Sequence, residues 1–579
     1  MLQQTINFKK GSTLLDVIIG SAIMLVVFVG FLSLLQIGTK LSFDNKARIS
    51  AVSLANERME YLHSLSYADL GTLHGIPSGD LQQTEQVTLN NITFIRRTLI
   101  QYIDDPKDGL GDEDENGITA DYKKARVEVS WSSHSHTKSI VLISNFAPTS
   151  IESLEGGGSL IVHVFDATVA PIEGTEVHII NTAANPNIDV TTYSNEDGKV
   201  IFPGSPAAAG YQITVTKPGY STEQTYDADA NNPNPNPGHL TVADGVTTSK
   251  DFFIDTLGSI IVKTFEVIKD YTWQDDFANQ SNIATSTDIA LADSKVSLAT
   301  GTDGYESDGS LIATTTTHEF LHEWQSASWN NDTPAGTEVK YHIYNSLGEL
   351  VPNSALPNNS FGFTNSPIDL SSISTTTYPA IALGAELNTT STSTTPAILD
   401  WQIAYSAGPT PLPNIALSLH GNKTIGEKSG NPIYKFSTTT QTGADANVTL
   451  ENTEWDQYSL EIENTSYDIQ RACEPLPLNL QPGATATLSL YLTAHTTHSL
   501  LVDVRDSSGN LLEDATVTLS RSGFNEESTT GACGQTFFKD LTKGSDYTLD
   551  VSKSGYQNTT ENDVVVNGTS KISVTLISE

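Results

Sequence analysis

The chain has 579 residues, a formal net charge of −38 and only two cysteines. So strong an acidity argues against broad nucleic-acid binding, which needs Lys and Arg to displace counterions from phosphates, and two cysteines exclude a disulfide-stapled mini-scaffold. The length allows about four domains, and the abundant Thr, Ser, Asn and Asp indicate short strands and polar turns on an exterior protein.

The first 35 residues contain a short basic leader and then a long apolar run. The leader ends in Lys9, Lys10 and Gly11, and no charged residue occurs from Val17 to Leu35. This run is long enough to cross a bilayer as a helix, and the lysines would hold the leader on the cytoplasmic side. A secretory signal peptide is cleaved after its apolar core, whereas here the candidate cleavage site precedes the apolar run.

Asp16 at the edge of this run is unexpected in a plain membrane anchor, because Asp at a helix centre costs about 2.5–3.5 kcal/mol on insertion scales. The arrangement resembles class III prepilin leaders. That resemblance implies cleavage between Gly11 and Ser12 by a prepilin peptidase, methylation of the new amine, and pairing of Asp16 with the N-terminal amine of a neighbouring pilin subunit. The family usually has Glu in place of Asp16 and an aromatic residue or Met in place of Ser12. An uncleaved anchor is the alternative.

The next segments continue the pilin-like pattern. Residues 47–65 keep a helical apolar spacing at Val52, Ala55, Met59 and Leu62, and residues 84–103 and 122–146 have the alternation of strands. About the first 150 residues resemble the minor pilins related to PilV, in the segments SLANERMEYLHSLSYADLG, YIDDPKDG and DYKKARVEVSW. This resemblance implies a pilin-like domain over 12–152, with a helix over about 14–65 and a small antiparallel sheet, after a leader over 1–11.

A glycine-rich stretch over 153–158 predicts a flexible linker, and an internal repeat follows it. SLIVHVFDATVAPIEGTEVHI (159–179) matches SLLVDVRDSSGNLLEDATVTL (499–519), and DGKVIF…GYQITVTKPGY (197–220) matches CGQTFF…DYTLDVSKSGY (533–556). These units resemble carboxypeptidase regulatory-like domains, which implies β-sandwiches over 159–256 and 498–579 that act as spacers or binders without zinc ligands. A looser copy is predicted over 413–497.

Residues 257–407 differ from the repeat and resemble a concanavalin-like or discoidin-like jelly roll, of the sort that binds glycans or extends a stalk. A Pro-rich stretch predicts a semi-rigid linker over 408–412. The predicted fold class is therefore multidomain and mainly β: a long N-terminal helix with a small sheet, then tandem Ig-like β-sandwich modules and a jelly roll.

His318, Glu319 and His322 match the H-E-x-x-H pattern of zinc proteases. That mechanism requires a helix, which puts both His on one face and lets Glu activate a metal-bound water. The four consecutive Thr at 314–317 favour a strand instead. We therefore predict no enzyme activity, with a surface metalloenzyme as a remote alternative.

Asp112, Asp114 and Asn116 have the D-x-D-x-N-G spacing of calcium loops, with Asp121 as a further ligand. Lys123 stands where an EF-hand needs Glu, so a solvated acidic hairpin tip competes with a calcium site. No other cofactor is predicted. Cys473 and Cys533 fall in neighbouring modules, and exported thiols tend to oxidise, so the sequence also predicts a disulfide between them.

These patterns together predict a large minor type IV pilin, held in the cytoplasmic membrane by one span and then assembled into an extracellular pilus. The expected partners are other pilin subunits, the prepilin peptidase, the inner membrane before assembly, and a glycan or other cell-surface ligand. The alternative from a different class is a pseudopilin of a type II secretion or DNA-uptake system, whose modules would grip cargo.

Overall fold

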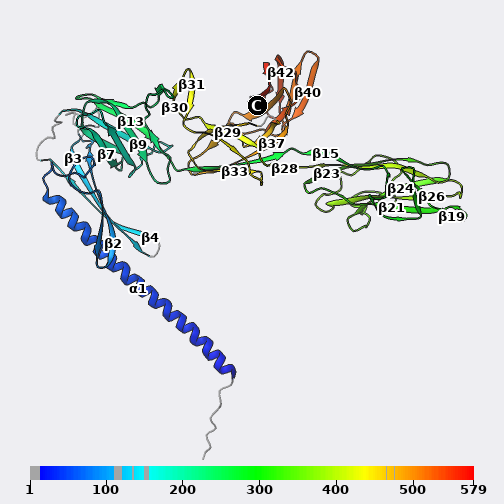
Figure 1. Cartoon of the computed structure of the whole chain (residues 1–579), viewed down its shortest axis with the longest axis horizontal. Helices are drawn as coiled ribbons and strands as arrows, with labels where there is room; N and C mark the ends of the chain where they lie inside the picture. Colours follow the sequence, from blue (N-terminus) through cyan, green and yellow to red (C-terminus); the bar gives the residue numbers. More distant parts are fainter. Residues whose placement is uncertain are drawn as a thin grey trace, which may run out of the picture. The chain divides into compact units, whose positions relative to one another are not determined.

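The structure of the chain is a computed structural model that describes residues 14–107, 109, 120–133, 136–148, 156–463, 466–474 and 476–579. The chain forms two compact units: Met1–Leu257 with Thr424–Lys435, and Gly258–Lys423 with Phe436–Glu579. Strands in small sheets dominate both units, and the first unit begins with one long helix (Figure 1). The predicted fold class is confirmed.

The helix α1 (Leu14–Ser64) packs its second half on a four-stranded antiparallel sheet in the order β1-β2-β3-β4. The strands are β1 (Thr84–Leu89), β2 (Ile92–Ile103), β3 (Tyr122–Ser133) and β4 (His136–Phe146). The buried stripe of the helix comprises Ala47, Ala51, Leu54, Ala55, Met59 and Leu62. Val52, which the sequence pattern assigned to this stripe, is 37% exposed. Its neighbour Ala51 faces the sheet instead, and successive residues point about 100° apart around the helix axis.

Module A is a sandwich of the sheets β13-β5-β8 and β10-β9-β6-β7, with β12 beside β9. Its strands are β5 (Gly158–Phe165), β6 (Glu176–Asn181), β7 (Ile188–Tyr193), β8 (Lys199–Ser205), β9 (Ala208–Thr216), β10 (Glu223–Gln224), β12 (Leu240–Val242) and β13 (Thr247–Phe253). The first and last strands pair in parallel, starting with Ser159 opposite Thr247. A small sheet in this unit joins β11 (Asn234–Pro235) to the hairpin of β30 (Thr424–Lys428) and β31 (Asn431–Tyr434).

Module C repeats this plan with the sheets β41-β38-β44 and β40-β39-β42-β43. Its strands are β38 (Ser499–Asp506), β39 (Thr516–Arg521), β40 (Phe524–Thr529), β41 (Gln535–Phe538), β42 (Gly544–Ser552), β43 (Thr559–Val566) and β44 (Thr569–Leu576). Its first and last strands are again parallel, starting with Ser499 opposite Thr569.

Module B is a third copy of this plan, but its chain is interrupted. The strand β14 (Gly258–Glu266) pairs in parallel with β37 (Thr485–Ala494), starting with Ser259 opposite Thr485. Its side chains Ile260 and Val262 enter the same core as Leu417 and Leu488. The remaining strands are β28 (Thr410–Pro411), β29 (Ala416–Gly421), β32 (Ser437–Gln441), β33 (Asn447–Thr453), β34 (Asp456–Ile462), β35 (Tyr467–Cys473) and β36 (Leu478–Leu480).

The division of the chain therefore differs from the expected one. The segment 258–266 was expected to open the jelly roll over 257–407, yet it supplies the first strand of module B, which was expected over 413–497. Thr410 and Pro411, within the expected linker 408–412, form β28 and pair with the end of β14. The residues between β14 and β28 are thus an insertion within module B.

The inserted domain is a β-sandwich with its own core of aromatic and aliphatic side chains, including Trp324, Trp401 and Tyr341. One sheet has the order β17-β18-β27-β23-β25 with β15 beside β27, and the other has the order β16-β21-β26-β22 with β24 beside β26. The strands are β15 (Lys269–Asp275), β16 (Ile283–Thr287), β17 (Ile289–Ala292), β18 (Lys295–Leu298), β19 (Thr300–Gly301), β20 (Gly304–Tyr305), β21 (Asp308–Ala313), β22 (Thr316–Thr317), β23 (Leu321–Asp332), β24 (Thr337–Asn345), β25 (Ile368–Asp369), β26 (Ala380–Thr389) and β27 (Ala397–Ala407).

A buried tyrosine marks the same place in all three modules. The hydroxyl of Tyr211 donates to the carbonyl of Pro206 at 2.6 Å, and that of Tyr547 donates to Thr542 at 2.8 Å. In module B the hydroxyl of Tyr458 is bonded in the same way, 2.6 Å from a carbonyl four residues upstream. Such a tyrosine fixes the corner between two sheets. The shared corner supports the assignment of module B as a third copy.

The glycines before module A pack closely against its backbone. Gly158 begins β5, and a Cβ added to it would lie 2.3 Å from the carbonyl oxygen of Ala243. A Cβ on Gly157 would lie 2.2 Å from the carbonyl oxygen of Ser205. Glycine is needed at these two positions because the backbone of module A lies against them. Gly157 and Gly158 therefore belong to module A, and the flexible linker predicted over 153–158 ends earlier than expected.

Candidate functional site

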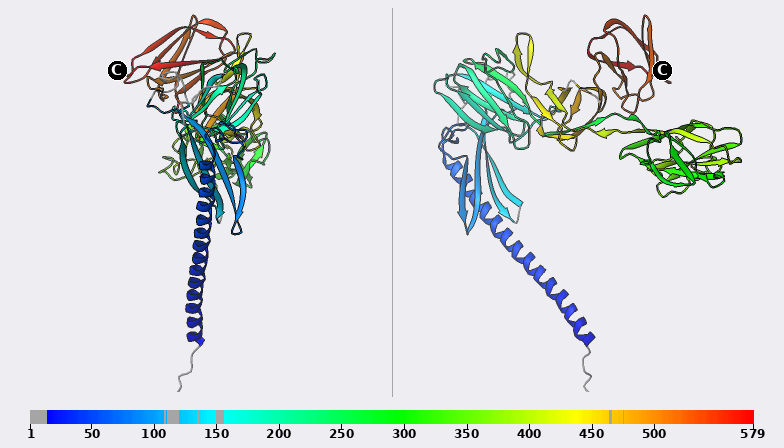
Figure 2. Two further views of the ribbon diagram at one scale, coloured as in Figure 1. Left: turned by 90° about the vertical axis from the view of Figure 1, so that its left-hand side faces the viewer. Right: turned by 45° about the vertical axis from the view of Figure 1, so that its right-hand side comes forward.

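The first half of α1 presents an apolar surface with no protein packed on it among the described residues. The side chains of Ile23, Met24, Phe28, Phe31 and Leu34 are 58 to 73% exposed, and in every view of Figures 1 and 2 this half extends away from the sheet. The helix is long and apolar enough to cross a membrane. An exposed apolar surface of this size marks a site of membrane insertion or protein association.

Ion pairs hold the second half of α1 to its sheet. Glu85 in β1 pairs with Arg58 of the helix and lies 3.0 Å from Arg96 in β2. Lower on the helix, Asp44 lies 2.7 Å from the amine of Lys138 in β4. Arg58 and Arg96 are buried, and a buried charge needs such a partner. The helix is therefore fixed to the sheet by charge as well as by its apolar stripe.

The leader residues Gly11 and Ser12 lie outside the described residues. Asp16 lies in the first turn of α1, and its side chain is outside the description. The apolar run that follows is helical as predicted. Cleavage, methylation and pairing at these three residues therefore remain predictions from the sequence.

The predicted calcium ligands Asp112, Asp114 and Asn116 also lie outside the described residues. Asp121 lies immediately before β3, where its backbone N–H donates to the carbonyl of Ile103 at 2.9 Å. Its carboxylate accepts a hydrogen bond from the backbone N–H of Asp105. Asp121 thus closes the base of the loop, and calcium binding stays a prediction.

The zinc-protease pattern does not lie on a helix. His318 is in a turn, with its ring 5.1 Å from the ring of Tyr271, and His322 is an exposed residue of β23. The backbone N–H of Phe320 donates to Nδ1 of His318 at 3.1 Å. The helical geometry that would turn both His toward one metal ion is not formed here. Within the described ranges, no three His, Cys, Asp or Glu side chains form a metal-binding group.

Module A is docked on the four-stranded sheet β1-β2-β3-β4, through side chains of β2 and β3. The guanidinium of Arg97 lies over the ring of Tyr193, 3.7 Å from its centroid, and the Tyr193 hydroxyl donates to Glu176 at 3.0 Å. The amine of Lys124 lies 2.9 Å from the carboxylate of Glu196. A cation over an aromatic face is worth about 0.5–2 kcal/mol. These contacts position module A on the sheet, and nothing in the sequence pattern pointed to them.

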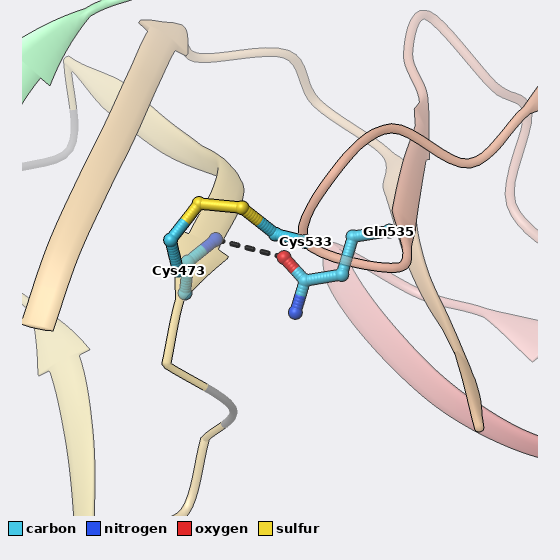
Figure 3. The surroundings of a disulfide bond; sticks show 4 residues. Cys473, Cys533 and Gln535 are labelled. Carbon is cyan, nitrogen blue, oxygen red and sulfur yellow. Dashed lines mark hydrogen bonds between the residues drawn. A yellow bond between two sulfur atoms is a disulfide. The ribbon is translucent and has the colours of Figure 1, made fainter. Parts of the chain in front are cut away.

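Modules B and C are joined covalently. A disulfide links Cys473, at the end of β35, to Cys533, just before β41, with the two Cα atoms 5.3 Å apart (Figure 3). The backbone N–H of Ala472 donates to Oε1 of Gln535 at 2.8 Å beside it. The pair predicted from the sequence is thus bonded in the structure, and the amide contact next to it was not predicted.

Asp468 forms a second, polar connection at the same joint. Its side chain is 2% exposed, and its carboxylate lies 2.7 Å from Nδ1 of His495. It also accepts hydrogen bonds from the backbone N–H of Thr496 at 3.0 Å and from the hydroxyl of Thr569 at 3.1 Å. A buried carboxylate is stable only when it is bonded in this way. Asp468 thereby joins module B, the connecting segment and module C.

The amine of Lys571 adds a further contact across the joint. It donates to the carbonyl of Leu476 in module B at 2.8 Å, and it lies 3.7 Å from the buried carboxylate of Asp503. Burial lowers the pKa of Lys571, and the Asp503 carboxylate opposes that change. The joint is therefore held by one covalent bond and several polar contacts.

Two segments of the chain match a known domain family. Residues 159–252 and 499–577 match the carboxypeptidase regulatory-like domain. These segments are modules A and C, as the sequence repeat predicted. The interrupted copy, module B, is not among the matched segments. A search of curated protein sequences finds no match to this chain.

Several solved structures align with the chain at low identity. The Bacillus anthracis TIE protein is 10% identical, with 87% of this chain and 76% of that chain covered and a TM-score of 0.16. BcpA, the major pilin subunit of Bacillus cereus, is 10% identical, with 73% and 100% covered and a TM-score of 0.13. GBS52, the minor pilin of Streptococcus agalactiae, is 12% identical, with 30% and 86% covered and a TM-score of 0.12. Identities and TM-scores this low carry no argument about function.

Proposed function

We propose that this chain is a large minor type IV pilin, which enters a filament through α1 and displays its β modules for adhesion or surface interaction. The observation that carries the proposal is the division of α1 into two halves. The first half is apolar and exposed, with Phe28 and Leu34 at 58 and 69%. The second half is fixed to the sheet by the ion pair of Arg58 with Glu85 and by an apolar stripe. A subunit that inserts one half of a helix among like helices needs both properties.

The size of the appended modules supports a minor subunit. Three sandwich modules and one inserted domain follow the pilin-like sheet. Carrying them on every subunit would crowd a thin filament, so few copies or a tip position are expected. Before assembly, the same apolar half would hold the protein in the cytoplasmic membrane.

The mature N-terminus tests this proposal. Protein recovered from cells with and without prepilin peptidase would be analysed by mass spectrometry. The expected result is a peptide that begins at Ser12 and is lost without the peptidase. An intact Met1, or cleavage after the apolar run, would reduce the chain to an ordinary anchored or secreted β-domain protein.

A further inference from the structure

A cavity of about 310 Å³ lies at the joint between modules B and C, beside the disulfide. Module B contributes Arg471 and Tyr491, and module C contributes Ser528, Thr529 and Gln535 among others. The volume is at the lower end of the range for small-molecule sites, about 300–1,000 Å³, and would hold one sugar residue. Arg471 lies two residues before Cys473, and Gln535 lies two residues after Cys533. The disulfide between the two cysteines therefore holds Arg471 near Gln535.

Two donors of residues that line this cavity have no hydrogen-bond partner among the described residues. Gln535 is 4% exposed, and its Oε1 is used by the Ala472 N–H, but its Nε2 is buried and unpartnered. The Nε atom of Arg471 is likewise buried without a partner. Leaving a buried donor unsatisfied costs about 1–3 kcal/mol. Both groups are donors, so a ligand that pairs with them must offer an acceptor.

The charge around the cavity is opposite to that of the protein. None of the residues that line it is acidic, although the chain carries a net charge of −38. Arg471 lies over the ring of Tyr491, 4.1 Å from its centroid, and forms no ion pair with the described part of the chain. The planar fork of donors of an arginine suits a carboxylate.

We propose that this cavity binds the carboxylate of an acidic sugar, a uronic or sialic acid residue of a surface glycan. The guanidinium of Arg471 and the amide of Gln535 hold the carboxylate. The hydroxyls of Ser528 and Thr536 are hydrogen-bonded to each other at 2.6 Å, which leaves each with spare bonding capacity. Together with the Thr529 hydroxyl they favour a sugar over a peptide C-terminus, because they can still exchange hydrogen bonds with sugar hydroxyls. The inference rests on the proposed function, in which the β modules bind a surface, and names the chemistry of the ligand.

The test is isothermal titration calorimetry of the full chain in detergent with glucuronate, N-acetylneuraminate, glucose, sulfate and N-acetylglycine. We expect at least one of the two acidic sugars to bind and glucose to show no heat. Binding of glucose as tightly as glucuronate, or no binding of either acidic sugar, would overturn the proposal. Sulfate or N-acetylglycine binding as tightly as the sugars would also overturn it, because the cavity would then select an anion or a peptide carboxylate.

Three variants sharpen the test. Arg471→Met should weaken acidic-sugar binding at least tenfold. Gln535→Glu should do the same, because it keeps the oxygen that accepts from Ala472 but replaces the free donor with a carboxylate oxygen. The matched control is Arg521→Met, which removes an arginine that also lies over a tyrosine ring, 4.9 Å from the Tyr547 centroid, outside the cavity. Equal weakening by the control would refute a specific site.

The two proposals fail separately in these experiments. The titration uses purified protein and needs no filament. A chain with its N-terminus at Ser12 that binds no acidic sugar refutes the cavity proposal and leaves the pilin assignment standing. A chain that keeps Met1 but binds glucuronate through Arg471 refutes the pilin assignment and supports the cavity.

Discussion

The carboxylate of Asp468 accepts a hydrogen bond from the hydroxyl of Thr569, 3.1 Å away and 101 residues further along the chain. Asp468 is in β35 of module B, and Thr569 opens β44 of module C, where it lies opposite Ser499. The parallel strands of module C begin with the pair Ser499 and Thr569, and this hydrogen bond ties that pair to a buried carboxylate of module B. The orientation of module C depends on this acid.

Replacing Asp468 with Ala should destabilise the joint by about 1–3 kcal/mol, because the donors of His495, Thr496 and Thr569 lose a buried acceptor. Amide hydrogen exchange of the full chain would report the loss as faster exchange in β44 and β37. Asp468→Asn, which keeps one acceptor oxygen, should cost less. Equal exchange in the wild type and Asp468→Ala would show that the carboxylate does not hold the joint.

Reduction of the disulfide should lower the stability of the joined modules by up to about 4 kcal/mol, the chain-entropy value for a closed loop of the observed separation, 60 residues. Urea unfolding of the full chain with and without dithiothreitol, followed by the amide hydrogen exchange of module C, would measure this loss of stability. The variant with both Cys473 and Cys533 changed to Ser is the control, and its transition should not respond to reductant. An unchanged wild-type transition would contradict the prediction.

Excision of the inserted domain should leave module B folded. The last residue of β14, Glu266, pairs with Thr410 at the start of β28 in an antiparallel register, so a two-residue Asn-Gly turn can replace residues 267–409. We expect module B of the shortened chain to melt within a few degrees of the temperature at which module B melts in the full chain. A longer deletion of 258–409 also removes β14 and should unfold module B. Retention of module B after the longer deletion would refute its assignment as an interrupted copy.

The interrupted module could have been found in the sequence, because each module opens with the same pattern. SLIVHVF (159–165) and SLLVDVR (499–505) were recognised as repeats, and SIIVKTF (259–265) matches them. It was missed because its partner strand lies more than 200 residues away, whereas the other two modules are continuous. The inserted domain separates the first strand from the rest of the core, and only the parallel pairing with β37 shows that they belong together.

Other features of the joint could not be predicted from the sequence. Two cysteines in neighbouring modules suggest a disulfide, since exported thiols oxidise. Nothing in the local pattern distinguishes Asp468 from other acidic residues, or Arg471 from other cations. Their roles arise from the donors and acceptors that the fold brings to them from module C. Local propensity therefore identifies elements and repeats, while burial and long-range contacts decide which polar residues matter.

Asp16→Ala should weaken incorporation of the protein into filaments without unfolding the β modules. The proposed partner of Asp16 is the N-terminal amine of a neighbouring subunit, and loss of the carboxylate removes that pairing. Immunoblots of sheared filaments and of membranes would measure incorporation, with thermal unfolding as the check on folding. Asp16→Glu, the residue usual in the family, is the matched control and should assemble normally. Normal assembly of Asp16→Ala would refute a role for this pairing in assembly.

Tyr211→Phe should lower the stability of module A by about 1 kcal/mol at neutral pH, because the hydroxyl that donates to Pro206 is lost from a fully buried position. Urea unfolding followed by amide exchange of β9 would measure it. The variant keeps the ring, so the core volume is nearly unchanged. A loss above about 3 kcal/mol would indicate repacking of the core instead of one lost hydrogen bond.

The same tyrosine should make module A sensitive to alkaline pH. Burial raises the pKa of Tyr211 from 10.0 to about 12, so the folded state keeps a proton that the unfolded state releases. The resulting stability is fully present below pH 10 and is lost as the pH rises toward about 12. The advantage of about 1 kcal/mol of the wild type over Tyr211→Phe should therefore shrink as the pH rises through 10.0 and reverse near about pH 11. A constant difference across this range would show that Tyr211 ionises in the fold as readily as in the unfolded chain.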